Sequence, residues 1–323
     1  MSPGSRLTSR PLVPDDTAFA ARAVSAAQPH HPWTEDELRI QWSSAARMGR
    51  ISTLVLEDAG RPAGWAAVTL FDGAVGGEGR VAVFLVGAGP ERLDQAWALV
   101  EDAARELGVR LGRASLWEND GLQLEALQSR GWEVKRRERF WRLDLAGQAE
   151  RLRDRRADAR RRVEAAGLRI VTAAEVGGEA IYPELHRVED VTAWDTPRDI
   201  PRVPIPYDAW LEWMRAPAVV PERVWLGLSG DRVVAMSYLD YGMTPVGTAY
   251  TGVVREHRGV GLARALKLET LVQAVELGVP AVETDNDEAN APILHLNEEL
   301  GYREIPGQVK LHKRLDAGGG GAT

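Results

Sequence analysis

One segment, residues 246–267, constrains the fold of this chain more than any other. An apolar run with β-strand character, residues 246–254, leads into a basic turn with two glycines, and a helical pattern follows directly. A strand that delivers backbone N–H groups to a helix N-terminus makes a site for anions. Gly259 and Gly261 let the backbone approach a ligand without a Cβ in the way, and Arg258 adds a positive charge. We therefore expect this turn to hold a phosphate-bearing cofactor.

Two common phosphate-binding motifs do not describe the turn. No Gly-Lys-Ser/Thr follows it, as a Walker A loop would require, and Arg264 stands where G-x-G-x-x-G needs its third glycine. The turn does match the form Q/R-x-x-G-x-G/A through Arg258, Gly261 and Ala263. That form resembles the acetyl-CoA signature of the GNAT superfamily of N-acetyltransferases. On these residues alone, a strand–helix turn in which the glycines serve only geometry fits equally well.

A second motif follows in the order that the resemblance requires. After the helix comes another strand pattern, residues 278–285, and then a segment similar to the family's N-x-x-A-x-x-L-Y-x-x-x-G-F. Asn290, Leu296, Gly301 and Tyr302 stand at the matching spacings. Two motifs in sequence are far more specific than either one, so the second half of the chain resembles one complete GNAT-like domain.

The chain also repeats itself at an interval of 170 residues. Glu-Leu-Gly-Val occurs with its glycine at 108 and again at 278, and a glycine before an aromatic residue occurs at 131 and 301. Strand–turn–strand patterns centred on Gly60 and Gly230 have the same offset. The repeat and the resemblance together imply an α/β (α+β) protein of two tandem GNAT-like domains. Each would have a mixed, mostly antiparallel central sheet flanked by helices.

The two copies are not equivalent at the anion site. At the common offset, Ala88-Gly-Pro-Glu91 replaces Arg258-Gly-Val-Gly261, and Asp120 replaces Asn290. The proline removes an N–H donor and the glutamate places negative charge where a pyrophosphate would lie. We expect a degenerate, non-catalytic domain over residues 1–147 and a catalytic domain over residues 167–316. The alternative is a second working cofactor site in the first domain.

The remaining segments are assigned from composition. Residues 148–166 are rich in arginine with interleaved acids and contain no proline or glycine, which predicts a solvated helical linker. An RNA-binding arm is the alternative, and the net charge of −7 disfavours it. The glycine-rich residues 317–323 are expected to form a disordered tail.

Composition also excludes several classes of protein. No run of 18 apolar residues predicts a membrane span, and the N-terminus lacks the apolar core of a signal peptide. The absence of cysteine excludes disulfides and thiolate chemistry, and the histidines include no H-E-x-x-H pattern. We expect a cytoplasmic protein with no metal, membrane or nucleic-acid partner. A monomer is favoured because tandem copies could satisfy the pairing that single-domain relatives reach by dimerising, and a dimer stays open.

The resemblance implies transfer of an acetyl group from acetyl-CoA, as co-substrate, to a small-molecule amine by direct attack in a ternary complex. The strand backbone at Val253 and Val254 would face the thioester and pantetheine, and Asn290 would bond near the pantetheine arm. Because these are main-chain contacts, side-chain exchange at Val253, Val260 or Leu262 is expected to matter little. The residues implied for the pyrophosphate are Arg258, Gly259, Val260, Gly261, Leu262 and Ala263.

One position departs from the family pattern. The tyrosine that protonates the departing sulfur corresponds to Asn297, which cannot act as a general acid but can donate a hydrogen bond. Tyr250 is another candidate for the acid, and Glu283 and Asp285, on one face of a strand, are candidates for the base. Packing for the tyrosine and turn capping for the carboxylates are the structural alternatives, and a water chain could also take the proton. Tyr238 and Tyr241 are further candidates for the acid, and Asp240 is a further candidate for the base.

The acceptor site is expected in the long acidic, aromatic and proline-rich segment 189–207. The alternative is a surface excursion that packs Trp210 and Trp213. A structural or RNA-associated module that uses the arginine-rich segment is one alternative, and two further classes of function remain open. The chain is either a tandem enzyme with an active C-terminal copy, or a non-catalytic acetyl-CoA-binding protein whose missing tyrosine reflects lost catalysis.

Overall fold

The computed structural model divides the chain into two compact units, Met1–Arg137 with Gly307–Thr323, and Glu138–Pro306. We call them unit 1 and unit 2. The predicted disordered tail, 317–323, lies outside the described residues. The residues that the structure describes are 6–28, 32–72, 76–197, 204–242 and 244–316.

The last strand of each repeat belongs to the sheet of the other repeat. Strand β6 (Glu133–Asp144) pairs antiparallel with β11 (Ala281–Asp287) of the second copy. Strand β12 (Arg303–Arg314) pairs antiparallel with β5 (Leu111–Trp117) of the first copy. The units therefore differ from the sequence-based division at 147 and 167, because a division by sequence position does not register an exchange of terminal strands.

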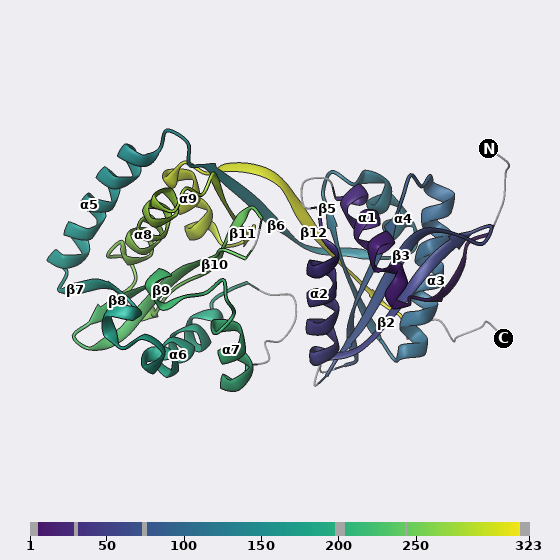
Figure 1. The fold of residues 1–323 in the computed structure, drawn as a ribbon, viewed down its shortest axis with the longest axis horizontal. Helices are drawn as coiled ribbons and strands as arrows, with labels where there is room; N and C mark the ends of the chain where they lie inside the picture. The colour runs from purple at the N-terminus through teal and green to yellow at the C-terminus, as the bar shows by residue number, and fades with distance from the viewer. Residues whose placement is uncertain (1–5, 29–31, 73–75, 198–203, 243, 317–323) are drawn as a thin grey trace. The chain divides into compact units, whose positions relative to one another are not determined.

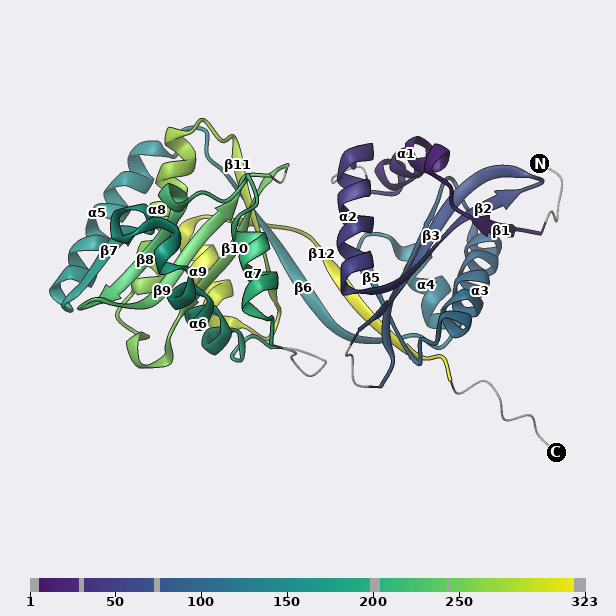
Figure 2. The same ribbon diagram turned by 60° about the horizontal axis from the view of Figure 1, so that its bottom comes forward.

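Unit 1 has the strand order β1-β2-β3-β4-β5-β12. Its β4–β5 pair is parallel and its other strand pairs are antiparallel. Helices α1 and α2 cover one face of the sheet, and α3 and α4 cover the other (Figure 2). The elements not yet bounded are β1 (Thr8–Pro11), β2 (Gly49–Asp58), β3 (Arg61–Phe71), β4 (Glu78–Leu85), η1 (Pro14–Asp16), α1 (Thr17–Ala27), α2 (Glu35–Met48), α3 (Pro90–Leu107) and α4 (Gly121–Ser129).

Unit 2 repeats this arrangement with the strand order β6-β11-β10-β9-β8-β7. Its β10–β11 pair is parallel, and the β6–β11, β9–β10, β8–β9 and β7–β8 pairs are antiparallel. Helices α5, α8 and α9 lie on one face and α6 and α7 on the other (Figure 1). The bounds are β7 (Leu168–Thr172), β8 (Val224–Ser229), β9 (Arg232–Asp240), β10 (Val246–Val253), η2 (Ala174–Val176), η3 (Gly178–Ile181), η4 (Pro221–Arg223), η5 (Arg255–His257), α5 (Ala149–Ala165), α6 (Tyr182–Ala193), α7 (Tyr207–Met214), α8 (Leu262–Glu276) and α9 (Ala291–Leu300).

The local patterns account for these elements. The predicted hairpins are confirmed: β2–β3 turns at Gly60 (φ 73°) and β8–β9 at Gly230 (φ 58°), both in the left-handed region where glycine is favoured. On β3, Ala66 belongs to the core beneath α3, while Trp65 belongs to the core beneath α1 and α2. The fold class expected from the sequence, tandem mixed sheets flanked by helices, is thereby confirmed.

The parallel strands β10 and β11 pair over a short stretch. Their register joins Val246 to Val282 and Gly247 to Glu283, whereas β10 continues beside β9 as far as Val253. The β9–β10 register also shifts between Thr248 and Tyr250. Within the described residues, the second half of β10 therefore has backbone groups on its β11 side that the ladder does not use.

Helix α5 occupies the arginine-rich segment but is not a solvated linker. Leu152, Ala159 and Val163 are buried in the core of unit 2. On the neighbouring helix α8, the Glu269 side chain is 1% exposed and accepts a 2.9 Å hydrogen bond from Arg160 Nε. The apolar spacing of this helix, masked in sequence by its arginines, is what packs it against α8.

The buried carboxylate gives a first testable prediction. Burial raises the pKa of Glu269 and the Arg160 guanidinium opposes the rise, so Arg160→Met should destabilise the protein by about 1–3 kcal/mol near neutral pH. An acid whose folded pKa is raised loses stability as pH increases through that pKa. The loss in Arg160→Met should therefore shrink below the ordinary carboxyl value of 4.5.

Denaturant unfolding of both proteins at neutral pH and at a pH below the ordinary carboxyl pKa measures this effect. The matched control is Arg161→Met, since Arg161 pairs with Asp158 and both side chains are largely exposed. It should change stability by less than about 0.5 kcal/mol. An equal loss in both variants, or a loss independent of pH, would contradict the assignment.

The strand exchange gives a second prediction. A fragment of residues 148–323 lacks β6 and leaves β11 as an unpaired edge, so it should aggregate or fail to fold alone. Circular dichroism and size-exclusion chromatography would compare it with the same fragment co-expressed with residues 1–147. A control chain cleaved at Gly147 after folding keeps every strand and should stay folded. A soluble, fully folded fragment would rule out a structural need for the exchange.

Candidate functional site

The turn from β10 to α8 depends on backbone conformations that favour glycine. Gly259 and Gly261 have φ angles of 83° and 86°. A Cβ placed on either residue would meet no atom within 4 Å. Glycine is therefore needed here for its left-handed conformation and not because of crowding, and the space above the turn is open.

Helix α8 begins at this turn with donors that need acceptors. Gly261 is its N-cap and supplies no side chain to cap the helix. The first-turn N–H groups, from Leu262 to Arg264, have no intrahelical acceptor, and the helix dipole adds positive potential. No acidic residue lies in this first turn, whereas α3, the equivalent helix of the first copy, carries Glu91 there. The turn thus has the chemistry of an anion site.

Two arginines and one aspartate set the charge of the turn. Arg258 Nε donates a 2.9 Å hydrogen bond to the Val253 carbonyl, and Arg258 Nη2 lies 2.5 Å from Asp195 Oδ2. Arg255 forms an ion pair with the other oxygen of Asp195. These arginines, Arg258 above all, hold the pKa of Asp195 below its ordinary value. In the described structure the predicted phosphate arginine is therefore already bound to a carboxylate at the end of α6.

A cavity of about 720 Å³ lies beside this ion-pair cluster. The C-terminal end of α6, the start of β9 and the η5 turn line it. Trp194 and Asp195, from the expected acceptor segment, are among its lining residues, together with Arg232, Arg255 and His257. A cavity of this size accommodates a small organic molecule. Residues 198–203 of the expected acceptor segment lie outside the described residues, and Trp210 belongs instead to α7, where it is buried.

The strand residues expected to face the cofactor are partly engaged in the fold. The Val254 N–H donates to the Val234 carbonyl at 2.9 Å, and the Val254 carbonyl accepts from His257 at 3.0 Å. Val253 pairs with Ala235 on β9. Val254 therefore has no free main-chain group for a ligand, because the sheet and the η5 turn use both.

Leu262 is a core residue, which corrects one expectation. Its side chain is 2% exposed, and a Cβ on Gly227 would come within 2.8 Å of Leu262 Cδ2. Exchange of this side chain would disturb the packing of α8 on β8, so the expectation that it matters little is wrong. Val260 is 39% exposed, and nothing in its packing opposes substitution.

Asn297 is fully buried on α9. Its Nδ2 donates a 2.7 Å hydrogen bond to Asn286 Oδ1 on β11, and among the described residues its Oδ1 has no partner. Asn290 is the N-cap of α9, but its side chain makes no capping bond, and its carbonyl accepts from Ile293 and Leu294. The second motif thus directs the Asn297 amide toward β11, whereas the Asn290 side chain does not cap the helix.

The candidate acid and bases occupy different surroundings. Tyr250 Oη lies 2.6 Å from Thr192 Oγ1 on α6, on the sheet face opposite α9. Glu283 Oε1 accepts a 3.1 Å bond from Arg142 on β6, and Asp285 is exposed on the same strand. The structure therefore does not bring Tyr250 and Asn297 together. Their catalytic roles stay predictions.

The other candidate residues are buried or already hydrogen-bonded within the fold. Burial raises the pKa of Tyr238 well above its ordinary value, and burial also raises that of Tyr241, whose ring lies 4.6 Å from the Arg223 guanidinium carbon. Asp240 accepts from the Gly242 N–H at 2.8 Å. A tyrosine with a raised pKa is a weaker proton donor, so these residues suit structural roles.

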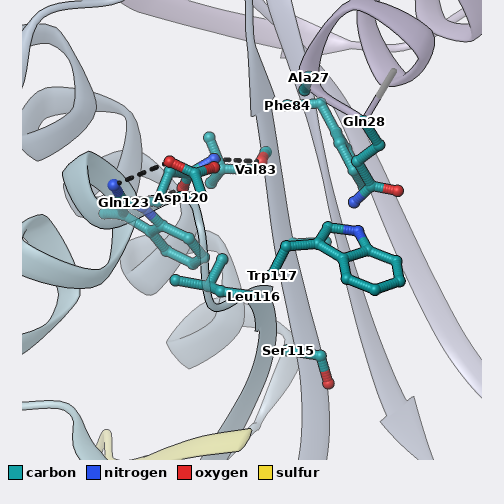
Figure 3. A pocket seen from close by; sticks show the side chains of 11 residues that line it. Ala27, Gln28, Val83, Phe84, Ser115, Leu116, Trp117, Asp120 and Gln123 are labelled. Carbon is teal, nitrogen blue, oxygen red and sulfur yellow. Dashed lines mark hydrogen bonds between the residues drawn. The ribbon is translucent and has the colours of Figure 1, made fainter. Parts of the chain in front are cut away.

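The equivalent position of the first copy is filled by side chains. Val83, 170 residues before Val253, has its carbonyl bonded by Gln123 Nε2 at 3.3 Å, and Trp97 donates to Gln123 Oε1 at 3.0 Å. Figure 3 shows Gln123 reaching both Val83 and Asp120. Burial raises the pKa of Asp120. The remaining cavity has a volume of about 30 Å³, roughly the share of one water molecule.

Metal chemistry and membrane insertion find no support in the described part of the chain. No group of three or more histidine, aspartate or glutamate side chains there could hold a metal ion. No helix of the same residues is long and apolar enough to cross a membrane.

Sequence reasoning missed three features of the site. Asp195 pairs with Arg255 and Arg258, which lie some sixty positions later in the chain. Asn286 accepts a hydrogen bond from the Asn297 amide, and Lys267 is buried in α8. The first two are contacts between distant segments and leave no local pattern. Lys267 did leave one, a cation directly between two leucines, Leu266 and Leu268, of a helix.

Comparison with known structures places the fold. A GCN5-related N-acetyltransferase from Sphaerobacter thermophilus superposes with a TM-score of 0.69 at 18% identity, covering 97% of this chain and 96% of that one. A tandem GNAT protein from the clavulanic acid biosynthesis pathway gives 0.68 at 20% identity, covering 98% and 100%. The chain thus has the tandem GNAT fold, as the sequence predicted.

Sequence comparison is more limited. No protein-family model matches the chain. A mycothiol acetyltransferase from Thermomonospora curvata is 35% identical over 100 residues, which are 29% of this chain and 34% of that protein. The match therefore spans about a third of the length of this relative.

The ion-pair cluster gives a prediction about anions. Asp195→Asn removes a negative charge that competes for Arg258, so inorganic pyrophosphate should bind about 2–10-fold more tightly. Titration calorimetry at low and high salt measures this, and the gain should shrink with salt. Asp208→Asn, an exposed change on α7, is the charge-matched control. Weaker binding in Asp195→Asn would show that the aspartate orients Arg258 instead of competing for it.

Proposed function

We propose that this protein is an acetyl-CoA-dependent N-acetyltransferase whose second copy, within unit 2, performs the reaction. The observation that carries the proposal is the short parallel pairing of β10 and β11 next to the glycine turn at the start of α8. The similarity to the N-acetyltransferase structures supports it, as does the partial match to a mycothiol acetyltransferase. Unit 1 is proposed as a non-catalytic partner.

The residues present fit acetyl-CoA. The N–H groups at the start of α8, the open space above Gly259 and Gly261, and the Arg258 guanidinium suit a pyrophosphate. The backbone of β10 beyond Gly247, free of β11, suits the amide groups of a pantetheine arm. Asn290 is proposed to bond near that arm. Acetyl-CoA supplies the activated acyl group, and the chain binds it, orients it and excludes water.

The proposed chemistry is direct transfer in a ternary complex. The amine attacks the thioester carbonyl while strand N–H groups polarise its oxygen. Glu283 or Asp285 on β11, or a water, takes the proton that the amine loses. Asn297 can offer a dipole to the departing sulfur but cannot protonate it.

The first copy is proposed not to bind acetyl-CoA. Gln123 and Trp97 occupy the position beside Val83, and Pro90 and Glu91 weaken the start of α3 as an anion site. Four of the seven arginines of α5 contact α8 or α9 in unit 2, which disfavours an RNA-binding arm; these are Arg151, Arg155, Arg156 and Arg160. We propose a monomer with no nucleic-acid partner.

The acceptor is proposed to be a small-molecule amine. The cavity beside Trp194 and Asp195 has a suitable volume, and the Glu256 carboxylate in its lining suits a cationic group, since Asp195 already pairs with Arg255 and Arg258. A mycothiol-synthase-like acyltransferase is a second candidate, favoured by the partial match to a mycothiol acetyltransferase. A non-catalytic acetyl-CoA-binding protein is a third, favoured by Asn297 in place of tyrosine. Release of free CoA in the presence of an amine library is expected of the two enzymes and not of the non-catalytic binding protein.

Calorimetry with acetyl-CoA tests the proposal directly. Wild-type protein should bind a single molecule per chain, and Gly261→Trp should abolish binding because a bulky left-handed residue strains and fills the turn. Glu91→Trp, the change at the same offset in the first copy, is the matched control and should bind normally. Binding of two molecules per chain would refute the silent first copy. Absence of binding by wild-type protein would refute the cofactor assignment.

A further inference from the structure

A lysine is buried in the middle of helix α8. The Lys267 side chain is 2% exposed, and its helix neighbours Leu266, Leu268 and Leu271 belong to the core of unit 2. Its Nζ lies 5.4 Å from the centre of the Tyr302 ring, a cation–π contact. Taking an ammonium out of water is costly unless an opposite charge lies close to it, so an unneutralised lysine in a core is unusual.

No carboxylate among the described residues forms an ion pair with Lys267. The charged group that acts on it is Asp285 on β11, through space, and the aromatic group that faces it is Tyr302 at the end of α9. Burial lowers the pKa of Lys267 to about 8, and Asp285 opposes this fall. The lysine therefore stays predominantly protonated at neutral pH while buried beside the sheet.

Unit 2 has further buried polar atoms without partners, and one of them belongs to Tyr302, the residue that faces Lys267. Tyr302 Oη, Thr248 Oγ1 and Asn297 Oδ1 are buried, and none of them has a hydrogen-bond partner of standard geometry among the described residues. Tyr302 and Thr248 nevertheless lie close enough for Thr248 to oppose the burial that raises the Tyr302 pKa. Unsatisfied buried polar groups require an explanation, and binding of a ligand is one.

The position of the cluster connects it with the proposed acyl donor. Thr248 directly follows Gly247, the last β10 residue paired with β11, so it stands where the two strands separate. On β11, Asn286 accepts the Asn297 amide and lies three residues beyond Glu283, the last β11 residue paired with β10. The polar groups thus line the start of the opening in which the thioester is proposed to lie.

We propose that Lys267 is the charge partner of the departing coenzyme A thiolate, in place of the tyrosine that the family motif would have at Asn297. The inference rests on the proposed function. As the amine nitrogen bonds to the carbonyl carbon, the C–S bond breaks and its electron pair goes to sulfur. The Lys267 ammonium stabilises that charge across the Tyr302 and Thr248 contacts. The amine proton leaves through Asp285 or water, and the thiolate takes up a proton after release.

Free coenzyme A tests this without an acceptor or turnover. The thiolate absorbs ultraviolet light that the thiol does not, so a pH titration of the bound molecule reports the pKa of its sulfur. In wild-type protein that pKa should lie about one unit or more below that of free coenzyme A. In Lys267→Met, which keeps side-chain length and removes the charge, it should return to the free value.

The matched control is Thr270→Val, which alters another buried polar side chain of α8 without changing charge. It should leave the pKa of the bound thiol lowered. Binding of coenzyme A with equal thiol pKa values in wild type and Lys267→Met would overturn the inference and leave the proposed function intact. Absence of coenzyme A binding by wild-type protein would overturn both.

Stability gives an independent readout. A lysine retained for its charge toward a ligand costs stability, so thermal unfolding of ligand-free Lys267→Met should occur at the same or a higher temperature than in wild type. Thr270→Val loses a buried hydrogen bond to the Lys267 carbonyl and should unfold somewhat earlier. Unfolding or marked destabilisation of Lys267→Met would assign the lysine to the core and overturn the inference.

Discussion

The organisation of unit 2 depends on the short pairing between its parallel strands β10 and β11. Backbone groups left out of a sheet must find other partners, and beyond Gly247 one side of β10 has none in the ladder with β11. The glycine turn and the uncapped start of α8 follow β10 directly, and the buried amide of Asn297 bonds to Asn286 on β11. The fold thus concentrates unsatisfied hydrogen-bonding capacity in one region, where a ligand rich in amide and phosphate groups could use it.

Helix α8 carries two buried ionisable side chains whose charges have different partners. Glu269 turns toward α5 and is neutralised by Arg160. Lys267, two residues earlier, faces Tyr302 and has no counter-ion among the described residues. The first arrangement is what a structural buried charge requires, since an uncompensated ion is costly. The second leaves Lys267 with the Tyr302 ring and the through-space charge of Asp285, an arrangement that suits its proposed role toward a thiolate.

The first copy differs from the second at the proposed cofactor position and still takes part in the sheet of unit 2. Gln123 Nε2 donates to the Val83 carbonyl and is itself held by Trp97, whereas in the second copy the Val253 carbonyl accepts from the Arg258 guanidinium. Yet this copy contributes β6 to the sheet of unit 2 and receives β12 in its own. A copy that supplies a strand cannot be removed without exposing a sheet edge, whether or not it binds anything.

The sequence by itself determined the repeat, the mixed sheets and the turn around Gly259 and Gly261, because strand alternation, helix periodicity and left-handed glycines are local patterns. It could not determine that β6 and β12 are exchanged between the two sheets. Each strand has the same local pattern whether it pairs within its own repeat or with the other repeat. Nor could it place Asp195 on Arg258 or Lys267 against Tyr302, contacts between segments far apart in the chain. It also treated α5 as a linker, because arginines concealed the apolar spacing that packing on α8 revealed. Local geometry follows from neighbouring residues, whereas charge pairing and burial depend on which distant segments the sheet brings together.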